Sequence, residues 1–86
     1  MRLRVTNYVT EYYRQVIENG NGFTKKHMYI LMMHLEPEQI CQETANLISA
    51  MLVDCDVTEA EFTKLITSFT DENLYLAYKA ISHLLF

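Results

Sequence analysis

Residues 5–17 read VTNYVTEYYRQVI, and their apolar positions recur with the period of an α-helix. These positions follow the i, i+3, i+4, i+7 spacing of one helical face, and they are Val5, Tyr8, Val9, Tyr12, Tyr13, Val16 and Ile17. Thr6 can cap the start of this helix. The sequence Gly20-Asn21-Gly22 can end it, because glycine accepts the left-handed conformation of a helix C-terminus. The segment predicts an amphipathic helix that other helices must cover.

The next two segments continue the helical pattern. Thr24 can cap a helix over residues 25–35, whose stretch Met28 to Met33 is apolar on every side and favours a central position. Pro37 turns the chain and suits the first position of a third helix, predicted to run without a break from Pro37 to Val53. The apolar face of that helix is Ile40, Thr44, Leu47, Ile48, Met51 and Cys55, widened by Cys41, Ala45 and Leu52.

Two more helix starts follow. Thr58 and Glu61 have the spacing of a capping box, and Thr70 can cap the last helix, with Asp71 and Glu72 in its first turn. The predicted buried stripes are Phe62, Leu65, Ile66 and Phe69, then Leu74, Ala77, Tyr78, Ile81 and Leu85. The sequence therefore predicts an all-α fold. Residues 1–86 are expected to form a single domain, a compact bundle or orthogonal array of about five short helices, with the second or third helix at its centre.

The composition leaves a surplus of apolar surface. Half of the residues are hydrophobic (50%), and the chain has only two glycines and one proline, which excludes a disordered polypeptide. A domain of 86 residues buries a modest core, so this content is slightly more than it can easily hide. Two interpretations stay open: a well-packed monomer with tyrosines at its rim, or a protein with a dimer or partner-binding face.

Charge is distributed unevenly along the chain. Residues 1–27 contain the basic side chains Arg2, Arg4, Arg14, Lys25 and Lys26 against two acids, whereas residues 28–86 contain two lysines against nine acids. An acidic domain repels the phosphate backbone, which disfavours nucleic acid as the main partner. A basic protein partner or head-to-tail pairing of two copies is electrostatically easier. Ordinary solvated helix ends would give the same pattern.

The two cysteines do not form a disulfide framework. On one continuous helix Cys41 and Cys55 would lie about 21 Å apart along the axis, too far for a bridge. Both are predicted to be buried apolar groups in a reducing compartment. The N-terminus lacks the apolar stretch of a signal peptide, and the longest apolar run is too short to span a bilayer. We therefore expect a cytoplasmic protein that does not enter a membrane.

The sequence contains no pattern typical of a catalytic, cofactor-binding or metal site. His27 and His34 are seven residues apart and His83 is distant, so no spacing brings metal ligands together. The apolar surroundings of Cys41 and the acids beside Cys55 both disfavour a reactive thiolate. These features predict that the protein is not an enzyme.

Aromatic side chains on the first and last helices are the candidate partner-binding residues, since interfaces are enriched in tyrosine. They are Tyr8, Tyr12, Tyr13, Tyr75, Tyr78 and Phe86. The sequence predicts a small, non-catalytic regulator or inhibitor that occludes the surface of a protein partner, by analogy with inhibitors from phages and mobile elements. Two alternatives stay open. One is a helix-turn-helix DNA-binding regulator, although its second helix would open with acidic side chains. The other is a structural subunit of a homo-oligomer, such as a homodimer.

One short segment has a counterpart in a known family. Residues 58–66, TEAEFTKLI, resemble a helix-opening sequence of the small acidic immunity proteins that block nuclease colicins. In that family the sequence lies near the N-terminus and a Tyr-Tyr-Pro loop follows it. Here it lies in the last third of the chain, and Tyr12-Tyr13 is followed by Arg14. No function and no binding residue is transferred from this resemblance.

Overall fold

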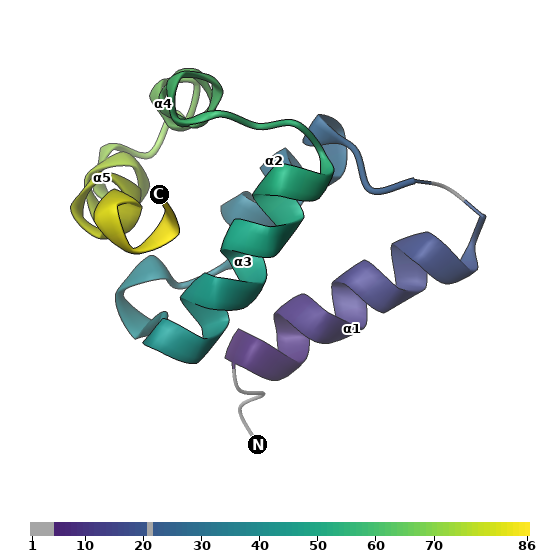
Figure 1. Cartoon of the computed structure of the whole chain (residues 1–86). Helices are drawn as coiled ribbons and strands as arrows, with labels where there is room; N and C mark the ends of the chain where they lie inside the picture. The colour runs from purple at the N-terminus through teal and green to yellow at the C-terminus, as the bar shows by residue number, and fades with distance from the viewer. Residues whose placement is uncertain (1–4, 21) are drawn as a thin grey trace.

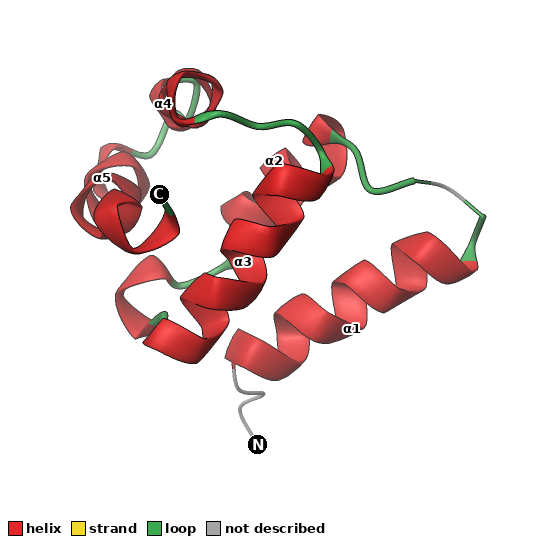
Figure 2. Ribbon diagram, viewed as in Figure 1, coloured by secondary structure: helices red, strands yellow, loops and turns green. Residues whose placement is uncertain are grey.

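Helices make up all of the regular secondary structure in residues 5–20 and 22–86, the ranges that this computed structural model describes (Figure 2). The elements are α1 (Val5–Glu18), α2 (Lys25–His34), the 3-10 turn η1 (Pro37–Gln39), α3 (Gln42–Asp54), α4 (Glu59–Thr67) and α5 (Glu72–Leu85). The predicted all-α fold of about five helices is confirmed.

Helix α3 occupies the centre of the molecule, with α1 packed on one side and α5 on the other (Figure 1). Helix α4 packs mainly against α5, and η1 also contacts α5. Ile48 and Leu52 of α3 are fully buried, as is Leu31 of α2. Met33 of α2 is 47% exposed, so one side of α2 faces solvent. The third helix, and not the second, is therefore the central one.

Helix α1 ends as expected but begins differently. Gly20 follows it at φ +80°, the left-handed conformation that glycine supplies at a helix end. The prediction that Thr6 caps the helix is wrong, because Thr6 lies inside α1. Its hydroxyl is hydrogen-bonded to the hydroxyl of Thr44, so it ties α1 to α3. Arg2, Arg4 and Asn21 lie outside the described residues.

The third helix is not continuous from Pro37, and this prediction is wrong. The chain forms η1 and then extends through Ile40 (φ −75°, ψ 112°) and Cys41 before α3 begins at Gln42. Pro37 and Ile40 are both buried by this break. The short 3-10 turn forms two backbone hydrogen bonds. The N–H groups of Gln39 and Ile40 donate to the carbonyls of Glu36 and Pro37. The burial of two apolar side chains favours the break over a longer helix.

The end of α3 is a Schellman motif built on aspartate instead of glycine. Asp56 has φ 58°, a conformation that Asp tolerates better than most residues. Its N–H donates to the Val53 carbonyl, and the Val57 N–H donates to the Leu52 carbonyl. Val57 and Leu52 are both buried, which is the apolar contact that accompanies this motif. The motif turns the chain into α4.

Of the two caps predicted for the last two helices, the one for α4 is correct and the one for α5 is not. The Thr58 hydroxyl accepts a hydrogen bond from the Glu61 N–H at 3.2 Å, so the predicted cap of α4 is confirmed. Thr70 does not cap α5, and that prediction is wrong. Asp71 takes the position, because its Oδ1 accepts from the N–H groups of Asn73 and Leu74. Both residue types are good caps, and sequence spacing alone does not separate neighbours.

Candidate functional site

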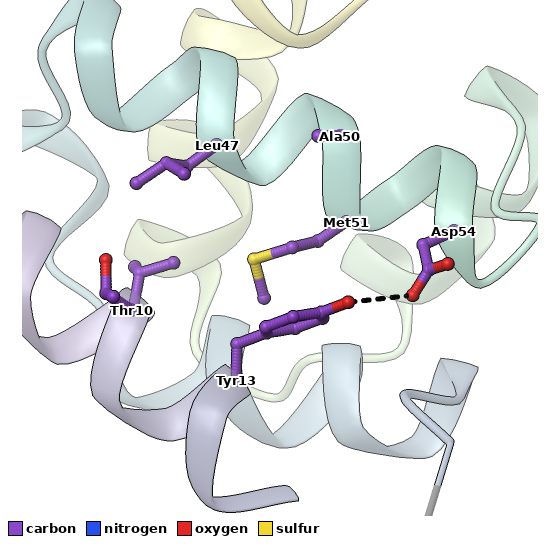
Figure 3. A pocket seen from close by; sticks show the side chains of 7 residues that line it. Thr10, Tyr13, Leu47, Ala50, Met51 and Asp54 are labelled. Atoms are coloured by element: carbon purple, nitrogen blue, oxygen red, sulfur yellow. Dashed lines mark hydrogen bonds between the residues drawn. The ribbon is translucent and has the colours of Figure 1, made fainter. Parts of the chain in front are cut away.

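An open apolar groove runs between α1 and α3. Its cavity volume is about 300 Å³, and it is partly open to solvent. The lining side chains are Val9, Thr10, Tyr13, Leu47, Ala50, Met51 and Asp54 (Figure 3). This volume is at the low end of the range for ligand pockets. An open groove of this size suits a few side chains from another surface better than an enclosed small molecule.

Two side-chain hydrogen bonds connect the helices that form the groove. At one end Thr6 meets Thr44, and Thr44 is buried. At the other end the Tyr13 hydroxyl donates to Asp54 Oδ2 at 3.3 Å (Figure 3). Since Thr6 and Tyr13 lie in this order on α1, as do Thr44 and Asp54 on α3, the two helices run in the same direction. The groove lies between these two bridges.

The sequence of α3 explains why this wall is exposed. Glu43, Leu47, Ala50 and Asp54 follow spacings of four, three and four residues, so they form one strip along the helix. The buried strip of α3 lies on another side, at Ala45, Ile48 and Leu52 in the heart of the core. α3 therefore presents acidic side chains at both ends of an apolar wall.

Apolar exposure continues beyond the lining residues on both helices. Leu47, which lines the groove, is 37% exposed. Outside the lining, Ile17 of α1 is 44% exposed and Val53, on another side of α3, is 75% exposed. Ile17 follows Tyr13 by four positions and shares its helical face. The sequence pattern placed Leu47 and Ile17 in buried stripes, and this was wrong for both. The apolar stripes of α1 and α3 are wider than the surface these helices bury against each other and against the rest of the fold.

Tyr13 is held in place by contacts on both ends of its side chain. Its ring lies against Phe23, with 5.1 Å between ring centroids, and Phe23 is buried. Removal from solvent raises the pKa of the Tyr13 hydroxyl, and the negative charge of Asp54 raises it further. The phenol therefore stays protonated and continues to donate to Asp54. Tyr13 forms a rigid aromatic edge of the groove.

The other predicted aromatic residues of α1, Tyr8 and Tyr12, are not among the side chains that line the groove. Tyr12 contacts Phe23 edge-on at 6.1 Å, and burial raises the pKa of Tyr12. Tyr8 is half-buried against the core. These tyrosines keep part of their surface exposed, as an interface residue must.

The aromatic residues at the C-terminal end do not join those of α1, since α3 lies between α1 and α5 (Figure 1). Tyr78 is fully buried, so the expectation that it contributes to an exposed patch is wrong. Tyr75 is half-buried with Lys79 Nζ 5.7 Å from its ring centroid. Phe86 is 48% exposed, although its ring packs on Phe62 at 5.4 Å. The six predicted residues therefore divide between two sides of the molecule.

The two cysteines differ in exposure and in acidity. Cys41 is exposed at the position before α3, which corrects the prediction of a buried thiol with a raised pKa. Hydrogen bonds from the hydroxyl and backbone N–H of Thr44 lower the pKa of Cys41. Cys55 is buried, and burial raises its pKa, with a further contribution from the charges of Asp54 and Asp56.

We expect Cys41 to react with iodoacetamide at least about tenfold faster than Cys55 at neutral pH. Cys41 has the lowered pKa, so more of it is thiolate, and its side chain is exposed to the reagent whereas that of Cys55 is buried. Mass spectrometry of native protein over a time course measures the two rates. The Cys41→Ser variant should lose the fast phase, and unfolding in urea should make the two rates similar. Equal rates in the native protein would contradict the arrangement described above.

His27 and His34 have local structural roles. His27 Nδ1 accepts a hydrogen bond from the Thr24 backbone N–H at 3.2 Å and so completes the cap of α2. His34 Nδ1 lies 2.9 Å from the Ile30 carbonyl, one turn earlier on the same helix. Within residues 5–20 and 22–86, no three His, Cys, Asp or Glu side chains are close enough to hold a metal ion.

Comparisons with protein-family models, with curated proteins and with solved structures gave no significant match. In the described part of the chain, no helix combines the length and apolar character needed to cross a bilayer. The groove between α1 and α3 is thus the feature of the described structure from which a function can be argued. The sequence pattern did not single it out. The one available signal was the excess width of the apolar stripes on residues 5–17 and 40–55.

Proposed function

We propose that the protein is a small, non-catalytic protein-binding module, a regulator or inhibitor that occludes a surface of its partner. The binding site is the groove between α1 and α3, and its occupant is a helical segment of the partner protein. The observation that carries this proposal is the apolar lining of the groove, in which Leu47 is 37% exposed and Ala50 is exposed as well. Apolar side chains gathered along one groove are typical of a helix-in-groove interaction.

The size of the apolar surface indicates what kind of complex this groove can form. Covering the exposed parts of Leu47 and of Ile17, which shares the face of Tyr13, would contribute roughly 2–4 kcal/mol. Association of two proteins costs about 4–15 kcal/mol in lost freedom of motion. Apolar contact alone is therefore insufficient, and Tyr13 and the polar side chains of the rim must add to it.

The helix-turn-helix alternative has no comparable support. α5 would be the recognition helix, but Asp71 caps it and Glu72 is in its first turn. These acids would face phosphates with charge of the wrong sign. A homo-oligomer built on the groove is a distinct outcome of the experiment below.

The proposal is tested by photo-crosslinking in the cell that produces the protein. The photoreactive residue p-benzoylphenylalanine replaces Ala50 in the groove or, as the matched control, Ala80, which is exposed on α5. We expect a defined adduct with another protein from position 50 and none from position 80. The adduct should be lost when Leu47→Gln is added, since this side chain lines the groove and is already partly exposed, so the fold should persist.

Besides the absence of any adduct from position 50, three results would overturn the proposal. The first is the same adduct from both positions, which indicates non-specific proximity. The second is an adduct only between two copies of the chain, which indicates a homo-oligomer. The third is an adduct at position 50 that survives the Leu47→Gln substitution in the groove wall. Circular dichroism of each variant confirms that the helices are intact.

A further inference from the structure

Carboxylates stand at both ends of the α3 wall of the groove. Glu43 lies in the first turn of α3 and Asp54 is its last residue, and both are exposed. They are eleven positions apart, which corresponds to about 16 Å along a helix. Leu47 and Ala50 lie between them on the same strip. The wall is therefore an apolar strip about three turns long with a negative charge at each end.

The opposite wall does not supply compensating positive charge. Arg14 is the only cation within Val5–Glu18, and Gln42–Asp54 contains none. Arg14 is bound by Glu11 through contacts of 2.5 and 2.6 Å to the two carboxylate oxygens. Glu18 is close enough to stabilise the charged form of Arg14 as well, and the pKa of Arg14 is raised. Two acids on α1 thus neutralise its single cation, so the walls as a whole are negative.

The arrangement of the helices favours a helical occupant. α1 packs mainly against α3, and the opposite side of α3 is covered by α5. Two helices that run side by side leave a straight depression into which the ridge of a third helix fits. A helix filling it would present apolar side chains at i, i+3, i+4 and i+7. About three turns of such a helix would match the distance between Glu43 and Asp54.

A second copy of this chain is a poor occupant. In a two-fold dimer the same patch faces itself, so the Glu43 and Asp54 side chains of one copy would approach acids of the other. Like charges across an interface weaken association. A partner with lysine or arginine beside its apolar stripe would instead be attracted by these acids, whereas a second copy would be repelled by them.

We propose that the groove between α1 and α3 binds a basic amphipathic helix, whose apolar stripe covers Leu47 and Ala50 and whose flanking Lys or Arg side chains pair with Glu43 and Asp54. This inference rests on the proposed function, because it names the chemistry of the partner at the same site. The new element is that the negative charges of Glu43 and Asp54 favour a basic partner over an acidic one.

The test uses two synthetic amphipathic helices of about 18 residues, long enough to be helical when stapled. Both carry leucine at i, i+3, i+4 and i+7. One has lysines on both flanks of the stripe and the other has glutamates at the same positions. Calorimetric titrations at low and physiological salt give the affinities, and amide chemical shifts locate the binding site. We expect the lysine peptide to bind at least about tenfold more tightly at low salt, with the preference reduced as salt screens the charges.

Variants of the protein test which acids make the difference. Glu43→Gln with Asp54→Asn should weaken binding of the lysine peptide about two- to tenfold, in keeping with exposed ion pairs. Asn at position 54 keeps an acceptor for Tyr13. The control, Glu59→Gln with Glu72→Gln, changes the net charge equally on α4 and α5 and should leave the affinity within about twofold. Leu47→Gln, in the groove wall, should weaken binding of the lysine peptide at least about tenfold.

The outcomes separate this inference from the proposed function. Equal affinity of the two peptides, no binding of either, or shifts that map outside the α1–α3 groove would each overturn the inference. A loss of affinity that is the same in the control variant would also overturn it. None of these results affects the crosslink from position 50, which reports on the groove whatever the charge of the partner. If that crosslink fails too, both proposals fall.

Discussion

Replacing Tyr78 with alanine is expected to remove about 3–5 kcal/mol from the free energy of unfolding, a large part of the stability of a small domain. Tyr78 is fully buried, and its hydroxyl donates to the Met32 carbonyl at 2.6 Å. Its ring lies 6.1 Å from Phe62 and 6.0 Å from Phe69 between centroids. Alanine would leave a cavity among these rings and a buried carbonyl without a donor. Urea unfolding followed by circular dichroism measures the loss.

Two further variants separate the ring from the hydroxyl. Tyr78→Phe keeps the ring and should cost only about 1–2 kcal/mol, from the carbonyl left unpaired. Tyr75→Ala, a half-buried tyrosine on the same helix, should cost clearly less than Tyr78→Ala. A Tyr78→Ala protein as stable as the Tyr75→Ala protein would show that this ring is not central to the core.

The same residue predicts how stability depends on alkaline pH. Burial raises the pKa of Tyr78 above its ordinary value of 10.0. Above that pH the unfolded chain loses the Tyr78 proton while the folded chain keeps it, so the folded state binds more protons and stability falls as pH rises. Tyr78→Phe should make this fall shallower. Tyr12, Tyr13 and Cys55, whose pKa values are also raised, contribute to what remains.

Much of this fold follows from local patterns that need no tertiary information. The spacing of Val9 and Val16 predicts α1, and both side chains are buried. Gly20 and Pro37 fall at the ends of helices because their backbone preferences act wherever the chain goes. Thr58 caps α4 as predicted, since its partner is only three residues away. Such features are set by neighbours in sequence.

Features that depend on distant partners could not be predicted in this way. The break before α3 exists because Ile40 finds a place in the core, and a helical periodicity cannot reveal that site. Thr6 lies inside α1 and its hydroxyl meets that of Thr44, thirty-eight positions away. The groove has the same origin: Leu47 looks like a core residue by spacing, but nothing within the described chain covers it completely. Whether a side chain is exposed depends on how the whole molecule packs. In the sequence, the surplus of apolar residues was the one indication that some of them would remain exposed.

Phe62→Ala is expected to release α4 from the rest of the molecule. α4 has nine residues and only two buried side chains, Phe62 and Ile66. A helix this short is not stable alone, so it depends on packing against α5. Phe62 supplies that packing through the rings of Tyr78 and Phe86, at 6.1 and 5.4 Å. Truncation should cost about 3–5 kcal/mol of the energy that holds α4 in place.

Hydrogen exchange distinguishes a local release from a global loss of stability. Amides of α4 should exchange about a hundredfold faster or more in Phe62→Ala, whereas amides of central α3 should change much less, since α3 keeps its contacts with α1 and α5. The control is Leu65→Ala, a half-buried position on the same helix, for which we expect less than about tenfold acceleration. Equal acceleration in α3 and α4 would mean that the domain opens only as a whole. In that case the ring of Phe62 stabilises the entire core, and α4 has no independent equilibrium.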